Sequence, residues 1–191
     1  MRIIAGAFRG RRLRGPDGGG VRPTSDRLRE TLFNILMPRI VGARVLDGFA
    51  GTGALGLEAL SRGAAHATFV EADPRALHVL RQNAAACGVE STCTIVRNDV
   101  QRFATRHPRP SGFDLVLLDP PYAFASPEAL LADVGGLLTA GGLLVLEHSR
   151  RRSAPAAPVG CDACRTVQAG DSALTFYHRR PDPARDTDDH A

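Results

Sequence analysis

Short apolar runs alternate with amphipathic stretches along most of the chain, from residue 44 onward. The apolar runs predict strands at residues 44–47, 67–71, 92–97, 114–119 and 143–147. The stretches between them predict helices at residues 54–62, 74–87, 100–106 and 127–138. Continuous runs such as residues 115–118 are typical of parallel strands that are covered on both faces. The repeated βα unit therefore predicts an α/β fold with a doubly wound, mostly parallel sheet, which binds ligands beyond the carboxyl ends of its strands.

The pattern is different before this region. Residues 2–14 alternate loosely around two glycines, which predicts a basic β-hairpin arm. Thr24 or Ser25 can then cap a helix whose leucine and isoleucine positions recur at i, i+4, i+7 and i+8. Pro38 is expected to end that helix.

The pattern also changes after residue 147. Two further strands, near residues 163–168 and 173–178, flank a short polar turn. They predict a C-terminal antiparallel hairpin at the edge of the sheet, which brings it to seven strands. We therefore expect an arm over residues 1–20, one domain over residues 21–180 and a disordered tail over residues 181–191.

The composition fits a single soluble domain. The 191 residues are 43% apolar and 23% charged, which excludes a disordered chain, and 20 Gly and 13 Pro exclude a coiled coil. No stretch approaches the roughly 20 apolar residues of a membrane span, and the first apolar run is too short for a signal peptide. We expect a cytoplasmic protein without membrane contact. The four cysteines form one C-x-x-C with no histidine at ligand spacing, so we expect reduced thiols and no metal site.

Positive charge is concentrated at the N-terminus. All 24 basic residues are arginines, and ten of them lie in residues 1–44 against three acids. A GC-rich genome would explain the absence of lysine, but not this position. The excess predicts contact with a polyanion such as a nucleic acid. The candidate contacts are Arg2, Arg9, Arg11, Arg12, Arg22 and Arg27.

A glycine-rich loop follows the first predicted strand. Gly51, Gly53 and Gly56 satisfy the spacing G-x-G-x-x-G, which by itself shows only a tight turn that something approaches closely. Asp47 ends the strand just before this loop. A carboxylate there would repel a pyrophosphate, but it suits a ligand with an ammonium group, such as S-adenosylmethionine.

Acidic side chains also follow the next two predicted strands. Glu71 could accept hydrogen bonds from both hydroxyls of a ribose, whether of this ligand or of a nicotinamide dinucleotide. Asp99, which follows Asn98, could reach an adenine amine or cap the next helix, and the two roles are compatible.

The fourth predicted strand ends in Asp119-Pro120-Pro121-Tyr122. Consecutive prolines hold the backbone extended and remove two donors. The Asp119 carboxylate and the Pro120 carbonyl can then converge on an exocyclic amine, which has two hydrogens to donate. Tyr122 offers a flat face on which a base can stack. A plain strand-ending turn with a packed tyrosine is the alternative.

Together these motifs resemble a known family. D-P-P-Y after the fourth strand and D-G-F-A-G-T-G after the first resemble the amino-methyltransferases that use S-adenosylmethionine. Five further segments are similar to those of the RsmD-type 16S rRNA guanine-N2 methyltransferases. They are R-I-I-A-G (2–6), R-G-R (9–11), R-P-T-S-D-R (22–27), R-E-T-L-F-N (29–34) and G-L-E-A-L-S-R-G-A (56–64). The resemblance covers about residues 1–149, and Ala5 stands where many members have a second glycine.

The resemblance implies a Rossmann-like class I methyltransferase fold. The reaction would move a methyl group from S-adenosylmethionine to the N2 amine of a guanine in 16S rRNA, within the 30S subunit, and leave S-adenosylhomocysteine. The implied cofactor residues are Asp47, Phe49, Ala50, Gly51, Gly53, Glu71, Asn98 and Asp99. The target amine would lie at Asp119, Pro120, Pro121 and Tyr122, and the arm would bind the rRNA. We expect a monomer.

Three alternatives stay open. An adenine-N6 or cytosine-N4 methyltransferase would use the same D-P-P-Y chemistry. A nicotinamide dehydrogenase would satisfy the glycine spacing but would leave Asp47 and the double proline unexplained. A non-catalytic RNA-binding assembly protein would keep the basic arm but would not need an intact Asp119.

Overall fold

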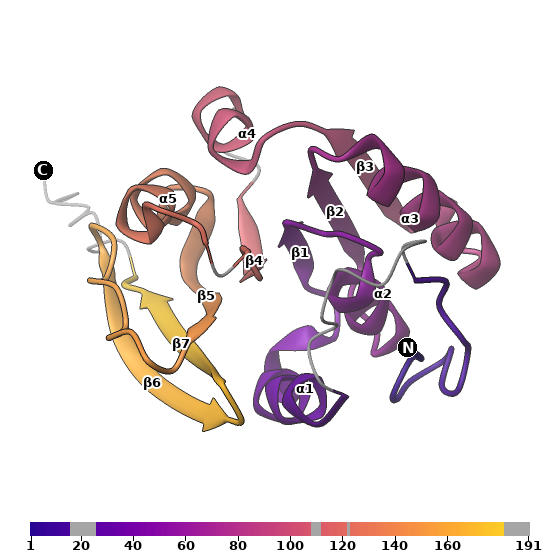
Figure 1. Cartoon of the computed structure of the whole chain (residues 1–191), viewed down its shortest axis with the longest axis horizontal. Coiled ribbons are helices and arrows are strands. Elements are labelled where there is room, and N and C mark those ends of the chain that lie inside the picture. The colour runs from indigo at the N-terminus through magenta and orange to yellow at the C-terminus, as the bar shows by residue number, and fades with distance from the viewer. Residues whose placement is uncertain (16–25, 108–111, 122, 182–191) are drawn as a thin grey trace, which may run out of the picture.

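A computed structural model describes residues 1–15, 26–107, 112–121 and 123–181 (Figure 1). Several positions singled out above lie outside the described residues: Arg22, Tyr122, the expected caps Thr24 and Ser25, and the expected tail from residue 182 onward. No helix in the described ranges is long and apolar enough to cross a membrane.

Within the described residues, seven strands form one sheet in the order β3-β2-β1-β4-β5-β7-β6. The strands are β1 (Arg44–Gly48), β2 (His66–Glu71), β3 (Cys93–Arg97), β4 (Phe113–Leu118), β5 (Leu138–Ser149), β6 (Cys161–Ala169) and β7 (Ser172–Arg179). The strands from β3 to β5 in this order pair in parallel, whereas β7 pairs antiparallel with both β5 and β6. The predicted parallel sheet and its C-terminal hairpin are confirmed.

Helices cover both faces of the sheet (Figure 1). α1 (Asp26–Ile40), α2 (Ala54–Ser61) and α3 (Pro74–Cys87), which precedes the short η1 (Glu90–Thr92), share one hydrophobic core with the sheet. α4 (Val100–Arg106) and α5 (Pro127–Gly135) share the core on the other face. Neighbouring residues of β1 divide between the two cores, Val45 in the first and Leu46 in the second. Both faces of the central strands are therefore buried, as their continuous apolar runs predict.

The strand order reverses between β1 and β4. From β1 the chain crosses to β2 and then β3 on one side, and it returns to β4 and β5 on the other. In open α/β sheets the ligand crevice lies at such a switch point, outside the carboxyl ends of the strands. The fold therefore places the candidate site at the ends of β1 and β4.

The boundary between α5 and β5 differs from the prediction. The helix expected over residues 127–138 ends at Gly135, and the strand expected over residues 143–147 begins at Leu138. Leu138 pairs with Phe113, and the register shifts before β5 pairs with β4 again. Gly141, which has a φ of 75°, lies within this irregular part of the strand. The glycines interrupt the apolar pattern there, and this is why the pattern predicts a strand only from residue 143 onward.

The end of α1 also differs from the prediction. Pro38 lies inside the helix, which continues to Ile40. Proline forfeits one helical hydrogen bond, but Ile40 is only 1% exposed and anchors the last turn in the core. Gly42, with a φ of 76°, follows and turns the chain toward β1. Burial of Ile40 therefore outweighs the local cost of the proline.

Residues 1–14 fold back on themselves, as the arm was expected to do. One antiparallel bridge joins Arg2 to Arg12, so the arm is hairpin-like but forms no extended strands. Ile3 and Leu13 are 1% and 5% exposed and belong to the same core as α1, α2 and α3. The arm is therefore packed into the fold.

Candidate functional site

The loop between β1 and α2 has an unusual backbone. Phe49 and Gly51 have positive φ angles of 63° and 54°. Glycine adopts such an angle without strain, whereas phenylalanine does not. A methyl group on Gly51 would meet no atom nearer than the Phe49 carbonyl oxygen, at 3.9 Å. The space beside Gly51 is therefore open, and a ligand can approach the backbone there.

The other two glycines of the motif serve packing. A methyl group on Gly53 would lie 2.3 Å from Leu80, and one on Gly56 would lie 2.3 Å from the Phe69 ring. These contacts bring α2 close to β2 and α3. Ala50, between the loop and the sheet, donates its N–H to the Val70 carbonyl at 3.1 Å and fixes the loop on β2.

Asp47, at the end of β1, is almost completely buried, with 1% of its surface exposed. Its Oδ2 accepts the Gly56 N–H at 2.8 Å. Burial nevertheless raises the pKa of Asp47 from 3.8 to about 7. The hydrogen bond from Gly56 lowers this pKa, whereas the negative charges of Asp119 and Glu71 raise it further. The carboxyl ends of β1, β2 and β4 thus gather three acids, a place where a bound cation would be stabilised.

Glu71, at the end of β2, holds the glycine loop in place. Its Oε2 accepts the Gly51 N–H, and its Oε1 accepts those of Ala72 and Asp73, each at 2.8 Å. A carboxylate has about four acceptor positions. Glu71 therefore has capacity for about one more donor in this conformation, fewer than the two ribose hydroxyls considered from the sequence.

Asn98 and Asp99 form the start of α4. Asp99 is the N-cap, and its Oδ1 accepts the N–H groups of Gln101 and Arg102 at 3.0 and 3.1 Å. The Asn98 side chain in turn accepts the Asp99 N–H at 2.9 Å. The capping interpretation of Asp99 is therefore confirmed, and contact with an adenine stays a prediction.

The turn after β4 brings a second loop against the glycine loop. Asp119 is half-buried, Pro120 is buried and Pro121 is exposed. The Pro121 carbonyl accepts the Phe124 N–H at 2.8 Å, which closes the turn. The Phe124 ring then meets the Phe49 ring edge to face, with centroids 5.5 Å apart. The two loops that carry the predicted cofactor and amine residues are thus in direct contact.

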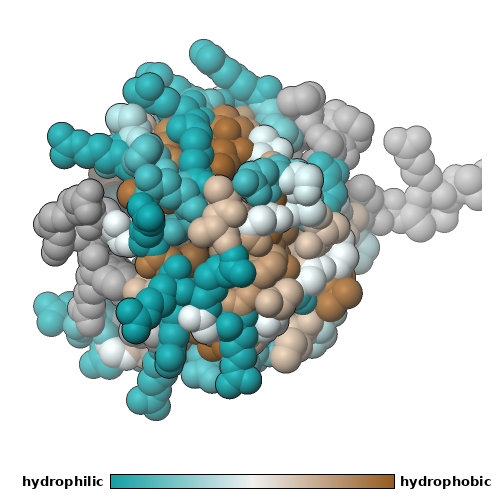
Figure 2. All heavy atoms as spheres, turned by 90° about the vertical axis from the view of Figure 1, so that its right-hand side faces the viewer, coloured by the Kyte–Doolittle hydropathy of each residue, from teal (hydrophilic) through white to brown (hydrophobic). Residues whose placement is uncertain are grey.

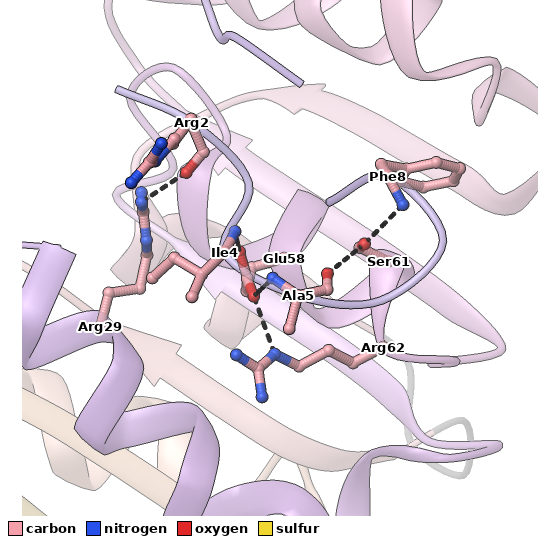
Figure 3. Close-up of polar contacts among 8 residues, drawn as sticks. All are labelled: Arg2, Ile4, Ala5, Phe8, Arg29, Glu58, Ser61 and Arg62. Carbon is pink, nitrogen blue, oxygen red and sulfur yellow. Dashed lines mark hydrogen bonds and ion pairs between the residues drawn. The ribbon is translucent and has the colours of Figure 1, made fainter. Parts of the chain in front are cut away.

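The arm is held on α2 by buried polar side chains (Figure 3). Glu58, which has no exposed surface, accepts the Ile4 N–H at 2.7 Å and the Ala5 N–H at 3.0 Å. It also pairs with Arg62 at 2.8 Å. Ser61 accepts the Phe8 N–H and donates to the Ala5 carbonyl, at 2.9 and 2.6 Å.

Close backbone approach and a second anchor complete this attachment. A methyl group on Gly6 would lie 1.8 Å from the Ser61 carbonyl oxygen, so only glycine fits there. Farther along the arm, the Asn83 side chain accepts the Arg14 N–H at 2.8 Å and donates to the Thr52 carbonyl at 3.0 Å. Asn83 thereby joins the end of the arm to the glycine loop.

The predicted RNA-binding arginines of the described residues point outward. Arg2, Arg9, Arg11, Arg12 and Arg27 are all exposed. Hydrophilic side chains project from much of the face that includes the arm and α3 (Figure 2). Among the N-terminal arginines that the structure describes, Arg29 is the exception, because it is buried and its Nη2 donates to the Arg2 carbonyl at 2.6 Å.

Sequence reasoning missed Glu58, Ser61, Asn83 and Arg29. Each lies on a helix, and each binds backbone groups of the arm or of the glycine loop. The signal available was a polar residue on the buried side of an amphipathic helix. That signal shows burial of the side chain but does not identify its partner.

The sheet order, the glycine loop and the acids at the carboxyl edge define the class I methyltransferase fold. A solved structure of yhhF from Escherichia coli, provisionally assigned as a methyltransferase, is similar with a TM-score of 0.84. The two chains are 38% identical, and the similarity covers 95% of this chain and 99% of that one.

Two relatives match nearly the whole chain. Ribosomal RNA small subunit methyltransferase D of Escherichia coli (strain K12) is 39% identical, over 98% of this chain and 94% of its own. YlbH of Bacillus subtilis (strain 168), provisionally named an rRNA methyltransferase, is 36% identical, over 94% and 100%. Residues 1–178 match the family described as Conserved hypothetical protein 95. The chain belongs to this family, the RsmD-type S-adenosylmethionine-dependent methyltransferases.

Proposed function

We propose that this protein transfers a methyl group from S-adenosylmethionine to the N2 amine of a guanine in small-subunit rRNA. The observation that carries the proposal is the placement of Asp119 and the Pro120 carbonyl at the end of β4, with Asp119 close enough to Asp47 to raise its pKa. The amine acceptors and the predicted cofactor site therefore share one edge of the sheet. The name of the Escherichia coli relative supports small-subunit rRNA as the substrate.

The residues at this edge fit the cofactor. Burial raises the pKa of Asp47, so its ionised carboxylate lacks stabilisation in the protein alone. A cationic ligand beside Asp47 would stabilise the ionised carboxylate and would in turn be bound strongly by it. The open space at Gly51 admits a ligand against the backbone, and Glu71 has capacity for a ribose hydroxyl. When bound, S-adenosylmethionine supplies an electrophilic methyl group.

Asp119 and Pro120 act on the amine. Its lone pair is conjugated with the guanine ring, so it is a weak nucleophile. Two fixed acceptors hold its hydrogens, orient the lone pair toward the methyl carbon and stabilise the positive charge that develops on nitrogen as the N–C bond forms. The extra proton leaves the nitrogen afterwards, and S-adenosylhomocysteine is the other product. Stacking of the base on Tyr122 is part of the proposal, and a stacked guanine must turn out of its helix to reach it.

The arm binds the RNA backbone. Its exposed arginines neutralise phosphates without distinguishing sequence, and Glu58, Ser61 and Asn83 fix their position relative to the glycine loop. The arm can thus hold the RNA in a constant orientation toward Asp119.

The test uses small ribosomal subunits from cells that lack this enzyme. They are incubated with the protein and labelled S-adenosylmethionine, and the labelled nucleoside is identified and mapped. We expect N2-methylguanosine at one position of the rRNA. Labelled N6-methyladenosine or N4-methylcytidine would contradict the assigned base, and an absence of label in any rRNA would contradict the substrate class.

A further inference from the structure

The exposed side of α3 is basic, and the proposed function gives it no role. Arg75, His78 and Arg81 are exposed and follow one another at intervals of three residues, which places them along one side of the helix. At 1.5 Å per residue, Arg75 and Arg81 lie about 9 Å apart along the helix axis. α3 contains no acidic residue, so the helix itself does not neutralise these arginines.

The end of the arm lies against this helix. The Asn83 side chain accepts the Arg14 N–H at 2.8 Å and donates to the Arg14 carbonyl at 3.1 Å, so two hydrogen bonds hold the arm backbone on α3. The Arg14 guanidinium donates to the Gln82 Oε1 at 3.1 Å, and the Gln82 Nε2 lies 2.9 Å from the His78 Nε2. In Figure 1 the arm and α3 accordingly lie side by side at the right. The basic side of α3 is therefore continuous with the arm.

The arm and α3 together form a strongly positive surface. Residues 1–15 and 74–87 contain seven arginines and no acidic residue, and all seven arginines are exposed. Two acids flank α3 in the chain, Asp73 at its N-cap and Glu90 in η1. Figure 2 views the molecule from this side and shows hydrophilic side chains projecting over much of it. The arginines far outnumber the neighbouring carboxylates, and such an excess fits a polyanionic partner.

The other face of the sheet shows that exposed arginines alone do not produce such a surface. α4 also carries two, Arg102 and Arg106. It packs beside α5, whose charged residues are the acids Glu128 and Asp133, and the Gln101 side chain donates to Asp133 at 2.9 Å. Positive and negative charges are therefore mixed on that face, whereas the arm and α3 leave the positive charge in excess.

The basic side of α3 begins at the edge of the sheet that carries the candidate site. α3 follows β2 directly, and Glu71, at the end of that strand, accepts the Asp73 N–H at 2.8 Å. Farther along the helix, Asn83 donates to the Thr52 carbonyl of the glycine loop at 3.0 Å. α3 is thus fixed to the site at two points, and a strand bound along it has a defined direction toward that edge.

We propose that Arg14, Arg75 and Arg81 bind phosphates of the rRNA that flanks the target nucleotide, on one surface with the arm. This inference rests on the proposed function and extends its RNA contact to α3. A guanidinium has several N–H donors, and the bond from Arg14 to Gln82 uses one of them. Contacts of this kind contribute affinity and orientation without reading the base, so they act on RNA binding and not on the methyl transfer itself.

The test compares two double variants that lose the same charge. Arg75→Ala/Arg81→Ala removes two of the proposed contacts. Arg106→Ala/Arg165→Ala is the control, because both arginines are exposed, one in α4 on the other face of the sheet and one in β6 at the edge farthest from β3. Binding to protein-free rRNA is measured over a range of salt concentrations. We expect the slope of log affinity against log salt to fall by about 1.5 in the first variant only, because each phosphate contact contributes roughly 0.7–0.9.

A third variant separates charge from structure. Arg75→Lys/Arg81→Lys keeps both charges and should keep the wild-type salt slope. With small ribosomal subunits as substrate, the alanine variant on α3 should raise KM several-fold while kcat stays near the wild-type value.

Equal slopes in the two alanine variants, or an equally reduced slope in the lysine variant, would overturn the inference. A fall in kcat at saturating subunits with KM unchanged would place these residues in the chemistry and would also overturn it. Weaker binding to subunits but not to protein-free rRNA would assign this surface to a protein partner, against the inference. Wild-type protein that leaves the subunits unmethylated would instead contradict the proposed function, and the salt slopes distinguish the two failures.

Discussion

Asp47 and Glu58 are both buried carboxylates, only 1% and 0% exposed, in the same βα unit, and their surroundings are opposite. Glu58 accepts two backbone N–H groups of the arm and pairs with Arg62. Asp47 accepts one N–H group and faces the charges of Asp119 and Glu71. The partners of Glu58 all belong to the fold, whereas Asp47 lacks a cation among its described contacts. The difference separates a carboxylate that builds the structure from one kept for a ligand.

The largest effect is expected from Glu58→Ala. This change leaves Arg62, whose side chain is 5% exposed, without its buried partner and leaves two arm amides without an acceptor. Breaking a buried ion pair in this way costs about 3–5 kcal/mol. Urea denaturation should show this loss in the free energy of unfolding. Glu90→Ala, at an exposed position, is the control, and similar losses in the two variants would remove the structural role of Glu58.

In the absence of cofactor, Asp47→Asn should have the opposite effect to Glu58→Ala and raise the free energy of unfolding near neutral pH. The folded-state pKa of Asp47 is about 7 and the unfolded value is 3.8, so between these values only the folded protein holds the proton. Stability therefore falls as pH rises from about 4 to about 7, by as much as about 4 kcal/mol, and the fall ends above pH 7. Asparagine cannot ionise and should abolish this contribution.

Unfolding free energies of the wild type and Asp47→Asn at pH 5 and pH 8 measure this contribution. The free energy of unfolding of the variant, relative to that of the wild type, should be higher at pH 8 than at pH 5. The variant should also bind S-adenosylmethionine far more weakly. A stability difference that is the same at both pH values would show that Asp47 is ionised in the folded protein throughout this range.

The smallest of these effects concerns the surface of the arm. Arg9, Arg11 and Arg12 are exposed, so replacing all three with alanine should leave the unfolding free energy nearly unchanged. RNA binding should weaken, and its log–log salt slope should fall by about 2, because about three phosphate contacts are lost. Filter binding at several salt concentrations tests this. An unaltered slope would mean that the arm presents a solvated edge and no RNA contact.

The sequence was sufficient to place the acids but not the contacts that organise them. Asp47, Glu71 and Asp119 each end a short apolar run, and parallel strands bring such ends to one edge. The same reasoning could not find the role of Glu58, because its partners, Ile4 and Ala5, lie on a segment far away in sequence and bind through the backbone. Backbone donors carry no sequence signature.

The face of a helix was predictable where burial alone decides it. Arg27, Glu30 and Asn34 fall outside the leucine and isoleucine spacing of α1, and all three are exposed. Arg29 was not distinguished from them, although it is fully buried and binds the Arg2 carbonyl. A buried arginine depends on a specific acceptor, here supplied by the arm, and the helical pattern does not contain that information.

Methyl transfer by Asp119→Ala in a single turnover, with cofactor affinity measured in parallel, tests the central claim most directly. The substrate is the small ribosomal subunit from cells lacking this enzyme. Removing one group that stabilises developing charge should slow the transfer on the order of 10²–10³-fold. The cofactor affinity of Asp119→Ala should stay within several-fold of the wild-type value. Asp119→Asn keeps one acceptor oxygen, so its rate of transfer should lie between those of the wild type and Asp119→Ala. Unchanged transfer by Asp119→Ala would contradict the account.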